Sequence, residues 1–135
     1  MRSQENLEVV RATWNAWLRG DLDGVLANVA PDAVWDMTPF REWPERQYIG
    51  PEGVRLFLSE WLDIWDAFEA GVEELRLAAD GRVVALAWQR GSGRRSGLAM
   101  DMDWGQVITV RDRMITKVES YDDSAKALKA VGLSE

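Results

Sequence analysis

The chain has 135 residues, of which 47% are hydrophobic, and this length suits one domain with a single core. Its 16 basic and 23 acidic residues give a net charge of -7, which argues against binding to nucleic acid or to an anionic membrane. There is no Cys and no His, so a disulfide framework is excluded, and neither a metal site of the zinc type nor a histidine proton shuttle is expected.

The sequence also bears on location and on the use of tryptophan. No apolar run approaches the roughly 20 residues of a membrane-spanning helix, and residues 1–5 lack the apolar core of a signal peptide. We therefore expect a cytoplasmic protein with no membrane partner. Eight Trp residues are present, and such a cluster either fills a small core or lines an aromatic pocket.

Two helices are predicted at the start of the chain. Apolar residues recur at helical spacing from Asn6 to Leu18, and Gly20 ends this first helix. Asp21 can cap a second, short helix over residues 22–29, which Pro31 closes. The fold is therefore expected to open with a helical hairpin.

A strand over residues 33–37 is predicted next, and an irregular loop over residues 38–48 follows it. The loop carries Phe40, Trp43 and Tyr48, so we expect it to cover part of the core.

The strongest helical pattern follows the turn at residues 50–53. Its apolar stripe continues for about four turns and consists of Val54, Phe57, Leu58, Trp61, Leu62, Trp65 and Phe68. We expect this helix to form a main wall of the core.

Beyond Gly71 the apolar period changes to two, which indicates strands on either side of a turn at Asp80 and Gly81. The segment of residues 91–97 is rich in Gly, Ser and Arg. We interpret it as a flexible connection in which Arg94 and Arg95 are solvated.

A long antiparallel hairpin is predicted from Leu98 to Asp123. Met100, Met102 and Trp104 alternate with acidic residues, and a polar turn near Asp112 precedes the returning strand. A final short helix follows over residues 124–132. Helices grouped on one face of a long, curled sheet make an α+β domain with a hollow on its concave side.

Short motifs support this order of elements along nearly the whole chain. They are Pro31 to Asp36, Tyr48 to Gly53, Val110 to Asp112, Tyr121 to Asp123, Ala127-Leu128 and Val131 to Leu133. With these motifs, the chain resembles the nuclear transport factor 2-like superfamily. Within that superfamily it is similar to the SnoaL-like polyketide cyclases and the ketosteroid isomerase-like proteins.

This resemblance implies a single α+β domain over residues 1–135. Its cone-shaped, curved sheet is mixed but mostly antiparallel, forms a half-barrel and packs against three helices from the N-terminal half, with a short C-terminal helix in addition. The resemblance also implies a deep apolar pocket for a small apolar ligand, no cofactor, and a homodimer packed through the sheet. Proteins of this fold include enzymes of several kinds as well as binding proteins, so the function has to be inferred from the residues of the site.

The sequence departs from the catalytic patterns of these relatives. Where cyclases of this kind often carry His and Asp on the last two strands, this chain has Gln106 and Ser120, neither of which takes up a proton near neutral pH. Isomerase-like members place a Tyr on the first helix, where this chain has Trp14 and Trp17. The turn before the last strand carries Arg113 where many relatives have Gly.

Asp36 is the candidate catalytic base. It lies between Trp35 and Met37 near the aromatic loop, where desolvation would raise its pKa. The alternative is that strand alternation turns Trp35 and Met37 inward and leaves Asp36 on the other face. Asp101 and Asp103 could also form a carboxylate pair, but a solvated or interface face explains them better.

Candidate substrate-binding residues combine aromatic rings with neutral or cationic polar groups. They are Trp14, Trp35, Tyr48, Trp61, Trp88, Arg90, Trp104, Gln106 and Ser120. Gln106 and Ser120 should face inward with Trp104 and could orient a carbonyl or hydroxyl group. For each of these residues the alternative is an ordinary structural role, in the core for the aromatic rings and the amide, and at the surface for Arg90.

Three functions remain open on the sequence. The first is an isomerase, cyclase or hydrolase type of enzyme that uses Asp36 as base. The second is a non-catalytic ligand-binding or accessory protein, which the loss of the His and Asp pair favours. The third is an assembly module whose cavity is filled by its own tryptophans. The sequence does not identify the ligand.

Overall fold

The computed structural model describes residues 2–40, 43 and 46–133 of the chain. Over these residues the elements follow the order α1 (Arg2–Leu18), α2 (Leu22–Leu26), β1 (Val29–Asp36), β2 (Gln47–Ile49), α3 (Gly50–Ile64), β3 (Trp65–Leu77), β4 (Val83–Gly93), β5 (Ala99–Arg111), β6 (Met114–Tyr121) and α4 (Ser124–Ala130).

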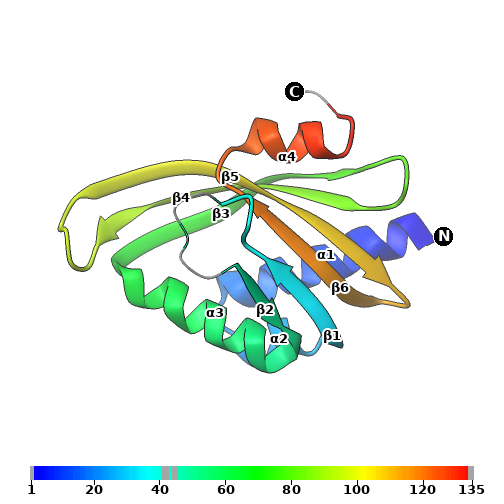
Figure 1. The fold of residues 1–135 in the computed structure, drawn as a ribbon, viewed down its shortest axis with the longest axis horizontal. Coiled ribbons are helices and arrows are strands. Elements are labelled where there is room, and N and C mark those ends of the chain that lie inside the picture. The colour runs from blue at the N-terminus through cyan, green and yellow to red at the C-terminus, as the bar shows by residue number, and fades with distance from the viewer. Residues whose placement is uncertain (1, 41–42, 44–45, 134–135) are drawn as a thin grey trace.

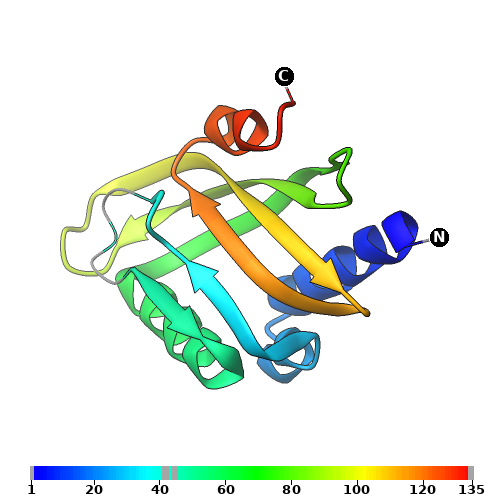
Figure 2. The same cartoon turned by 45° about the vertical axis from the view of Figure 1, so that its right-hand side comes forward.

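The strands form one curled, mixed sheet in the order β2-β1-β6-β5-β4-β3. β1 and β6 pair in parallel, and every other neighbouring pair is antiparallel. Figures 1 and 2 show α1, α2 and α3 on the concave side of the sheet and α4 on the convex side. The predicted α+β half-barrel, with three helices inside and a short helix at the C-terminus, is therefore confirmed.

Alternation along the strands divides the sheet into an inner and an outer face. On β4, Val83, Ala85 and Ala87 join the main core under the helices. Val84 instead packs outward with Val107 and with the α4 residues Ala127 and Leu128. Both faces of the middle of the sheet are thus covered, although the main core lies on the concave side.

The predicted long helix is shorter than its apolar stripe. α3 ends at Ile64, and Trp65 and Phe68 belong to β3, so their assignment to the helix is wrong. Pairing of β3 with β4 over most of their length outweighs the helical spacing of these two residues. Trp65 still packs in the core beside Trp61. Its burial is therefore predicted correctly, although it belongs to a strand and not to the helix.

The first strand begins earlier than predicted. α2 ends at Leu26, and Val29, expected on that helix, is already in β1. Pro31 therefore lies inside β1, where the pairing with β6 shifts register between Val29 and Val34, and such an irregularity accommodates a proline. The end of the predicted loop is also a strand, because β2 pairs with β1 through Tyr48 and Trp35.

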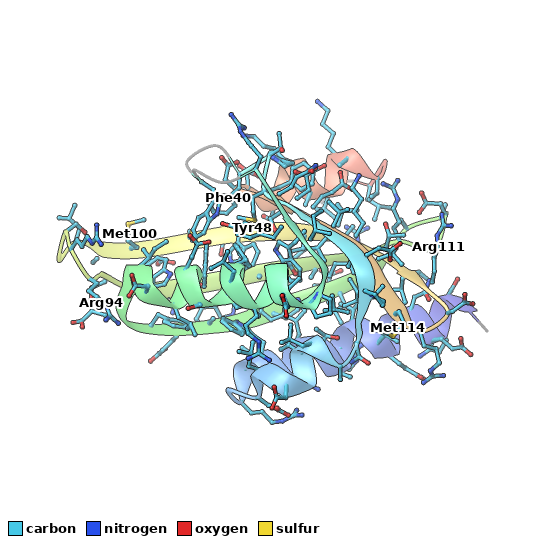
Figure 3. All side chains as sticks on the ribbon, turned by 60° about the horizontal axis from the view of Figure 1, so that its bottom comes forward. Phe40, Tyr48, Arg94, Met100, Arg111 and Met114 are labelled. Atoms are coloured by element: carbon cyan, nitrogen blue, oxygen red, sulfur yellow. The ribbon has the colours of Figure 1, made fainter. Side chains whose placement is uncertain are left out.

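The connection between β4 and β5 is more ordered than its composition indicates. β4 continues to Gly93, and the Arg94 side chain donates a hydrogen bond to the backbone oxygen of Trp65 at 3.0 Å. The Arg94 backbone N–H also donates to the oxygen of Ile64 at 2.7 Å. The expectation that Arg94 is only solvated is therefore wrong. Arg94 holds the hairpin of β4 and β5 against the end of α3. Figure 3 shows Arg94 and Met100 at the tip of this hairpin.

In the part of the chain that the structure describes, no helix has both the length and the apolar character needed to cross a membrane.

The turn between β5 and β6 offers a test of backbone strain. Asp112 and Arg113 both have positive φ, at 50° and 65°, as the tight turn of a twisted hairpin requires. Left-handed backbone costs roughly 1–2 kcal/mol for a residue other than Gly. Glycine loses more conformational entropy on folding, which offsets part of this gain. We therefore expect Arg113→Gly to stabilise the fold by about 0.5–1 kcal/mol. The measurement is the free energy of unfolding in urea.

The ion pair lost with Arg113 is small, because its 3.9 Å contact with Glu5 lies at the exposed surface. Arg111→Gly is the matched control, since Arg111 is in extended backbone and its replacement should destabilise the strand. A loss of stability in Arg113→Gly as large as in this control would contradict the strain argument.

Candidate functional site

A small, partly open cavity lies between the concave face of the sheet and the three helices. Its volume is about 50 Å³. Its lining side chains among the described residues are all uncharged, and they are Val10, Thr13, Trp14, Trp17, Val25, Trp35, Phe57, Leu58, Trp61, Trp104, Gln106, Ile108, Ile115 and Val118. The tryptophans therefore have both of the roles expected from the composition. They fill most of the interior, and they line the cavity that remains.

One wall of the cavity comes from α1. Val10, Thr13, Trp14 and Trp17 are three or four residues apart and therefore share one helix face. The Thr13 hydroxyl donates to the backbone oxygen of Val9 at 2.8 Å and accepts from the Asn28 amide at 3.3 Å. Since both contacts are internal, this hydroxyl is already engaged in holding α1 to the start of β1.

The sheet supplies the opposite wall, with one buried amide in it. Trp104, Gln106 and Ile108 alternate along β5, so all three face inward. The Gln106 Oε1 atom accepts a hydrogen bond from Trp14 Nε1 at 3.1 Å, and Gln106 is only 4% exposed. This bond fixes the indole of α1 against the floor of the cavity.

A second bond of the same kind fixes α3. Trp61 Nε1 donates to Gln89 Oε1 at 3.1 Å, which ties the helix to β4. Trp104 lies between the two anchored indoles, with ring centroids 5.9 Å from Trp14 and 5.7 Å from Trp61. Such ring pairs add about 0.5–1.5 kcal/mol each beyond the area they bury.

Several buried polar atoms around the cavity lack a partner among the described residues. They include the indole N–H groups of Trp35 and Trp104, which belong to lining residues, and the Ser120 hydroxyl. A buried donor without an acceptor costs about 1–3 kcal/mol. The interior thus holds more hydrogen-bond donors than acceptors.

The structure brings several of the predicted binding residues together. Trp14, Trp35, Trp61, Trp104 and Gln106 all line the cavity. Ser120 is fully buried and pairs in register with Gln106 on the inner face, next to the lining residues but not among them.

Tyr48 is buried away from the cavity, on the far side of Phe57. Its ring lies 5.4 Å from that of Phe57, and its hydroxyl donates to Glu60 Oε1 at 2.8 Å and accepts from Trp43 Nε1 at 2.9 Å. Figure 3 shows Tyr48 and Phe40 near the connection between β1 and β2. Here Tyr48 links that connection to α3.

Asp36 lies on the opposite face of β1 from the buried Trp35 and is half-buried. It is in register with Glu119, and its carboxylate accepts from the Thr38 backbone N–H at 2.9 Å. Burial raises the pKa of the Tyr121 hydroxyl, and the carboxylates of Glu119 and, more weakly, Asp36 add to the rise while Arg82 opposes it. Asp36 is therefore near Tyr121 and does not line the cavity.

Trp88 and Arg90 also lie on the convex face. A Cβ at Gly71 would be 2.7–2.8 Å from the Trp88 indole, so the missing side chain makes room for this ring on the neighbouring strand. The Arg90 guanidinium lies 5.2 Å from the centroid of the Trp88 ring and forms a 3.5 Å ion pair with Asp101. These residues form a surface cluster away from the cavity.

Two polar residues of the site, Thr13 and Gln89, are not among the residues predicted from the sequence. Thr13 was detectable from its place on the α1 stripe, and Gln89 from its alternation with Ala85 and Ala87. Trp17 also lines the cavity, although it is not among the predicted substrate-binding residues. Among the described residues, no group of three His, Cys, Asp or Glu side chains could hold a metal ion.

The SnoaL-like domain family matches residues 10–118, and the chain belongs to this family. No curated protein matches the chain. Among solved structures, it is similar to an NTF2-like protein from Burkholderia xenovorans, with 27% identity and a TM-score of 0.72 over 96% of this chain and 97% of that one.

Two other structures share the fold at lower identity. TerC, co-crystallised with polyporic acid, has 22% identity and a TM-score of 0.75, over 94% of this chain and 97% of TerC. A protein with a ketosteroid isomerase-like fold from Catenulispora acidiphila, in complex with trimethylamine, has 17% identity and a TM-score of 0.70, over 93% of each chain.

The bond between Trp14 and Gln106 can be tested by a double-mutant cycle. We expect Gln106→Leu to lower the free energy of unfolding by about 1–3 kcal/mol, because the Trp14 N–H then has no acceptor. Trp14→Phe in the Gln106→Leu background should cost less than Trp14→Phe alone, since the unpaired donor is removed. Urea denaturation of the four proteins measures this coupling, and strictly additive effects would rule the bond out as a stabilising contact.

Proposed function

We propose that the protein binds a compact, neutral and mainly apolar molecule in the tryptophan-walled cavity, without acid-base catalysis by its own side chains. One observation carries the proposal: none of the fourteen lining residues is titratable. General acid-base catalysis requires a proton-exchanging group within hydrogen-bond reach of the substrate, and the candidate base Asp36 lies on the other face of β1.

The polar groups around the cavity favour a guest that accepts hydrogen bonds. The Trp35 and Trp104 indoles and the Ser120 hydroxyl are buried donors without a partner among the described residues, and the Gln106 amide is close by. A carbonyl or ether oxygen would supply the acceptor that the two indole N–H groups lack. We therefore propose a neutral guest with one such oxygen.

The size of the cavity limits the guest. A cavity of about 150 Å³ lined by apolar side chains holds benzene or xenon, and this one is about 50 Å³. At this volume it therefore suits a molecule of a few heavy atoms. TerC and the C. acidiphila protein, which share the fold, were crystallised with small molecules.

The runner-up function is an enzyme of the isomerase, cyclase or hydrolase type with Asp36 as base. Asp36→Asn separates the two. As a binding protein, the variant should keep the wild-type affinity, because Asp36 does not line the cavity. Loss of turnover of a carbonyl substrate in Asp36→Asn, with unchanged affinity, would favour the enzyme.

Xenon is a direct probe of the cavity, because it binds dry apolar cavities without needing polar contacts. We expect a saturable shift in the ¹²⁹Xe NMR signal with the wild-type protein. Val118→Leu should weaken xenon binding by about tenfold or more, because the added methylene occupies a cavity that holds only a small guest. The matched control is Asp36→Asn, which should leave xenon binding unchanged. Equal binding by the wild type and Val118→Leu would contradict the assignment of the site.

We also propose that two copies associate through the convex face of the sheet. The half-buried Trp88 and the neighbouring Leu86 give this face an apolar surface beside α4. We expect sedimentation equilibrium to give twice the chain mass for the wild type and the single-chain mass for Trp88→Glu, because a buried charge without a partner is unfavourable at an interface. A wild-type protein that sediments as a monomer would rule out this association.

A further inference from the structure

Trp17 differs from every other residue around the cavity. Of the fourteen lining residues that the structure describes, thirteen are buried and Trp17 alone is half-exposed. Its indole therefore borders both the cavity and the solvent. Any opening of the cavity that leaves the rest of the core in place passes this side chain.

The other indoles of the wall are held by specific contacts. Trp14 and Trp61 are hydrogen-bonded to glutamines of the sheet, and Trp104 lies between their rings. Trp35 packs against Phe57 with ring centroids 5.5 Å apart. Trp17, by comparison, has neither a hydrogen bond nor an aromatic ring contact within the described part of the chain, so it is held by apolar packing alone.

The position of Trp17 in the fold leaves it space to move. It lies in the last turn of α1, next to Leu18, which is 46% exposed. Gly20, with φ of 76°, then redirects the chain into the five-residue helix α2. A rotation of the Trp17 side chain away from the cavity therefore carries the ring into solvent and does not push it into packed core.

We propose that Trp17 is the gate of the cavity and that its outward rotation admits neutral guests with a single aromatic ring. With Trp17 in its present position the cavity of about 50 Å³ is much smaller than the one of about 150 Å³ that holds such a ring. Displacing one indole, among the largest of side chains, removes this limit. The proposal rests on the proposed function for its ligand class, but the gate itself can be tested without a ligand.

The test uses Trp17→Ala, with Leu18→Ala as the matched control from the same helical turn. The first readout is the quenching of tryptophan fluorescence by acrylamide, a small neutral quencher. Removing a half-exposed Trp should by itself lower the accessible fraction of the fluorescence. If Trp17 is the gate, the accessible fraction instead rises, because acrylamide reaches Trp14, Trp61 and Trp104 through the open cavity.

The second readout is the association rate of benzene, followed by the NMR line shapes of the indole N–H signals. If the open state of the wild type is populated at about 10% or less, benzene associates about ten times more slowly than with a protein that is always open. Trp17→Ala lacks the gate, so it should bind benzene about tenfold faster or more. Leu18→Ala should match the wild type in both readouts. If Trp17→Ala does not fold, Trp17→Leu replaces it, with a smaller change in the same direction.

The outcomes separate the gate from the binding function. A lower accessible fraction in Trp17→Ala, with unchanged benzene kinetics, would overturn the gate and leave the binding function intact. Increased quenching without benzene binding by either protein would support the gate as an access route and would contradict its extension to guests with a single aromatic ring. An equal increase in quenching for Leu18→Ala would assign the effect to fraying of α1 and would overturn the gate.

Discussion

Two hydrogen bonds from indoles to amides determine how the helices sit on the sheet. Trp14 of α1 donates to Gln106 of β5, and Trp61 of α3 donates to Gln89 of β4. The hydrophobic effect is non-directional, whereas a buried donor that loses its acceptor costs about 1–3 kcal/mol. The bonds therefore fix the depth and rotation of both helices. Trp104, between the two indoles, sets their spacing.

The same arrangement explains why a cavity remains in a core so rich in aromatic rings. Large flat rings that are fixed by hydrogen bonds cannot all turn to fill the last space between them. What remains is a small void of about 50 Å³, bordered mainly by indoles and aliphatic side chains. Its polar groups are neutral, so the chamber can orient a guest but has no side chain suited to exchange protons with it near neutral pH. This neutral lining is the observation on which the proposed binding function rests.

Much of the fold was predictable from the sequence, because in most elements the apolar residues recur at the spacing of a helix or a strand within that one segment. The stripes of α1 and α3 and the alternation of Met102 and Trp104 specify both the element and its inner face, whereas Met100, earlier in the same alternation, is 45% exposed. The errors fell where pairing between distant segments decides the conformation. Trp65 continues a helical stripe but is in a strand, because β3 finds its partner in β4. Arg94 is in a glycine-rich segment, yet it holds the end of α3.

The site was only partly predictable for a related reason. Parity along β5 placed Gln106 and Trp104 inward, since that inference needs only one strand. For Asp36 the sequence left two faces open, and the pairing of β1 with β6 places it beside Glu119 on the outer face. The partners of Trp14 and Trp61 could not be predicted, because the sequence does not give the crossing of helix over sheet. Nor does any local pattern indicate that Trp17 is the half-exposed residue among the described wall residues.

The most direct test of this account is the exchange rate of each indole N–H proton with solvent, measured by NMR on protein with ¹⁵N-labelled tryptophan. If the two indole-to-amide bonds fix the helices, the protons of Trp14 and Trp61 exchange as slowly as the most protected backbone amides, and that of Trp17 exchanges much faster. Exchange of the Trp14 and Trp61 protons at the rate of Trp17 would show that these bonds do not hold the cavity wall, and would contradict the account.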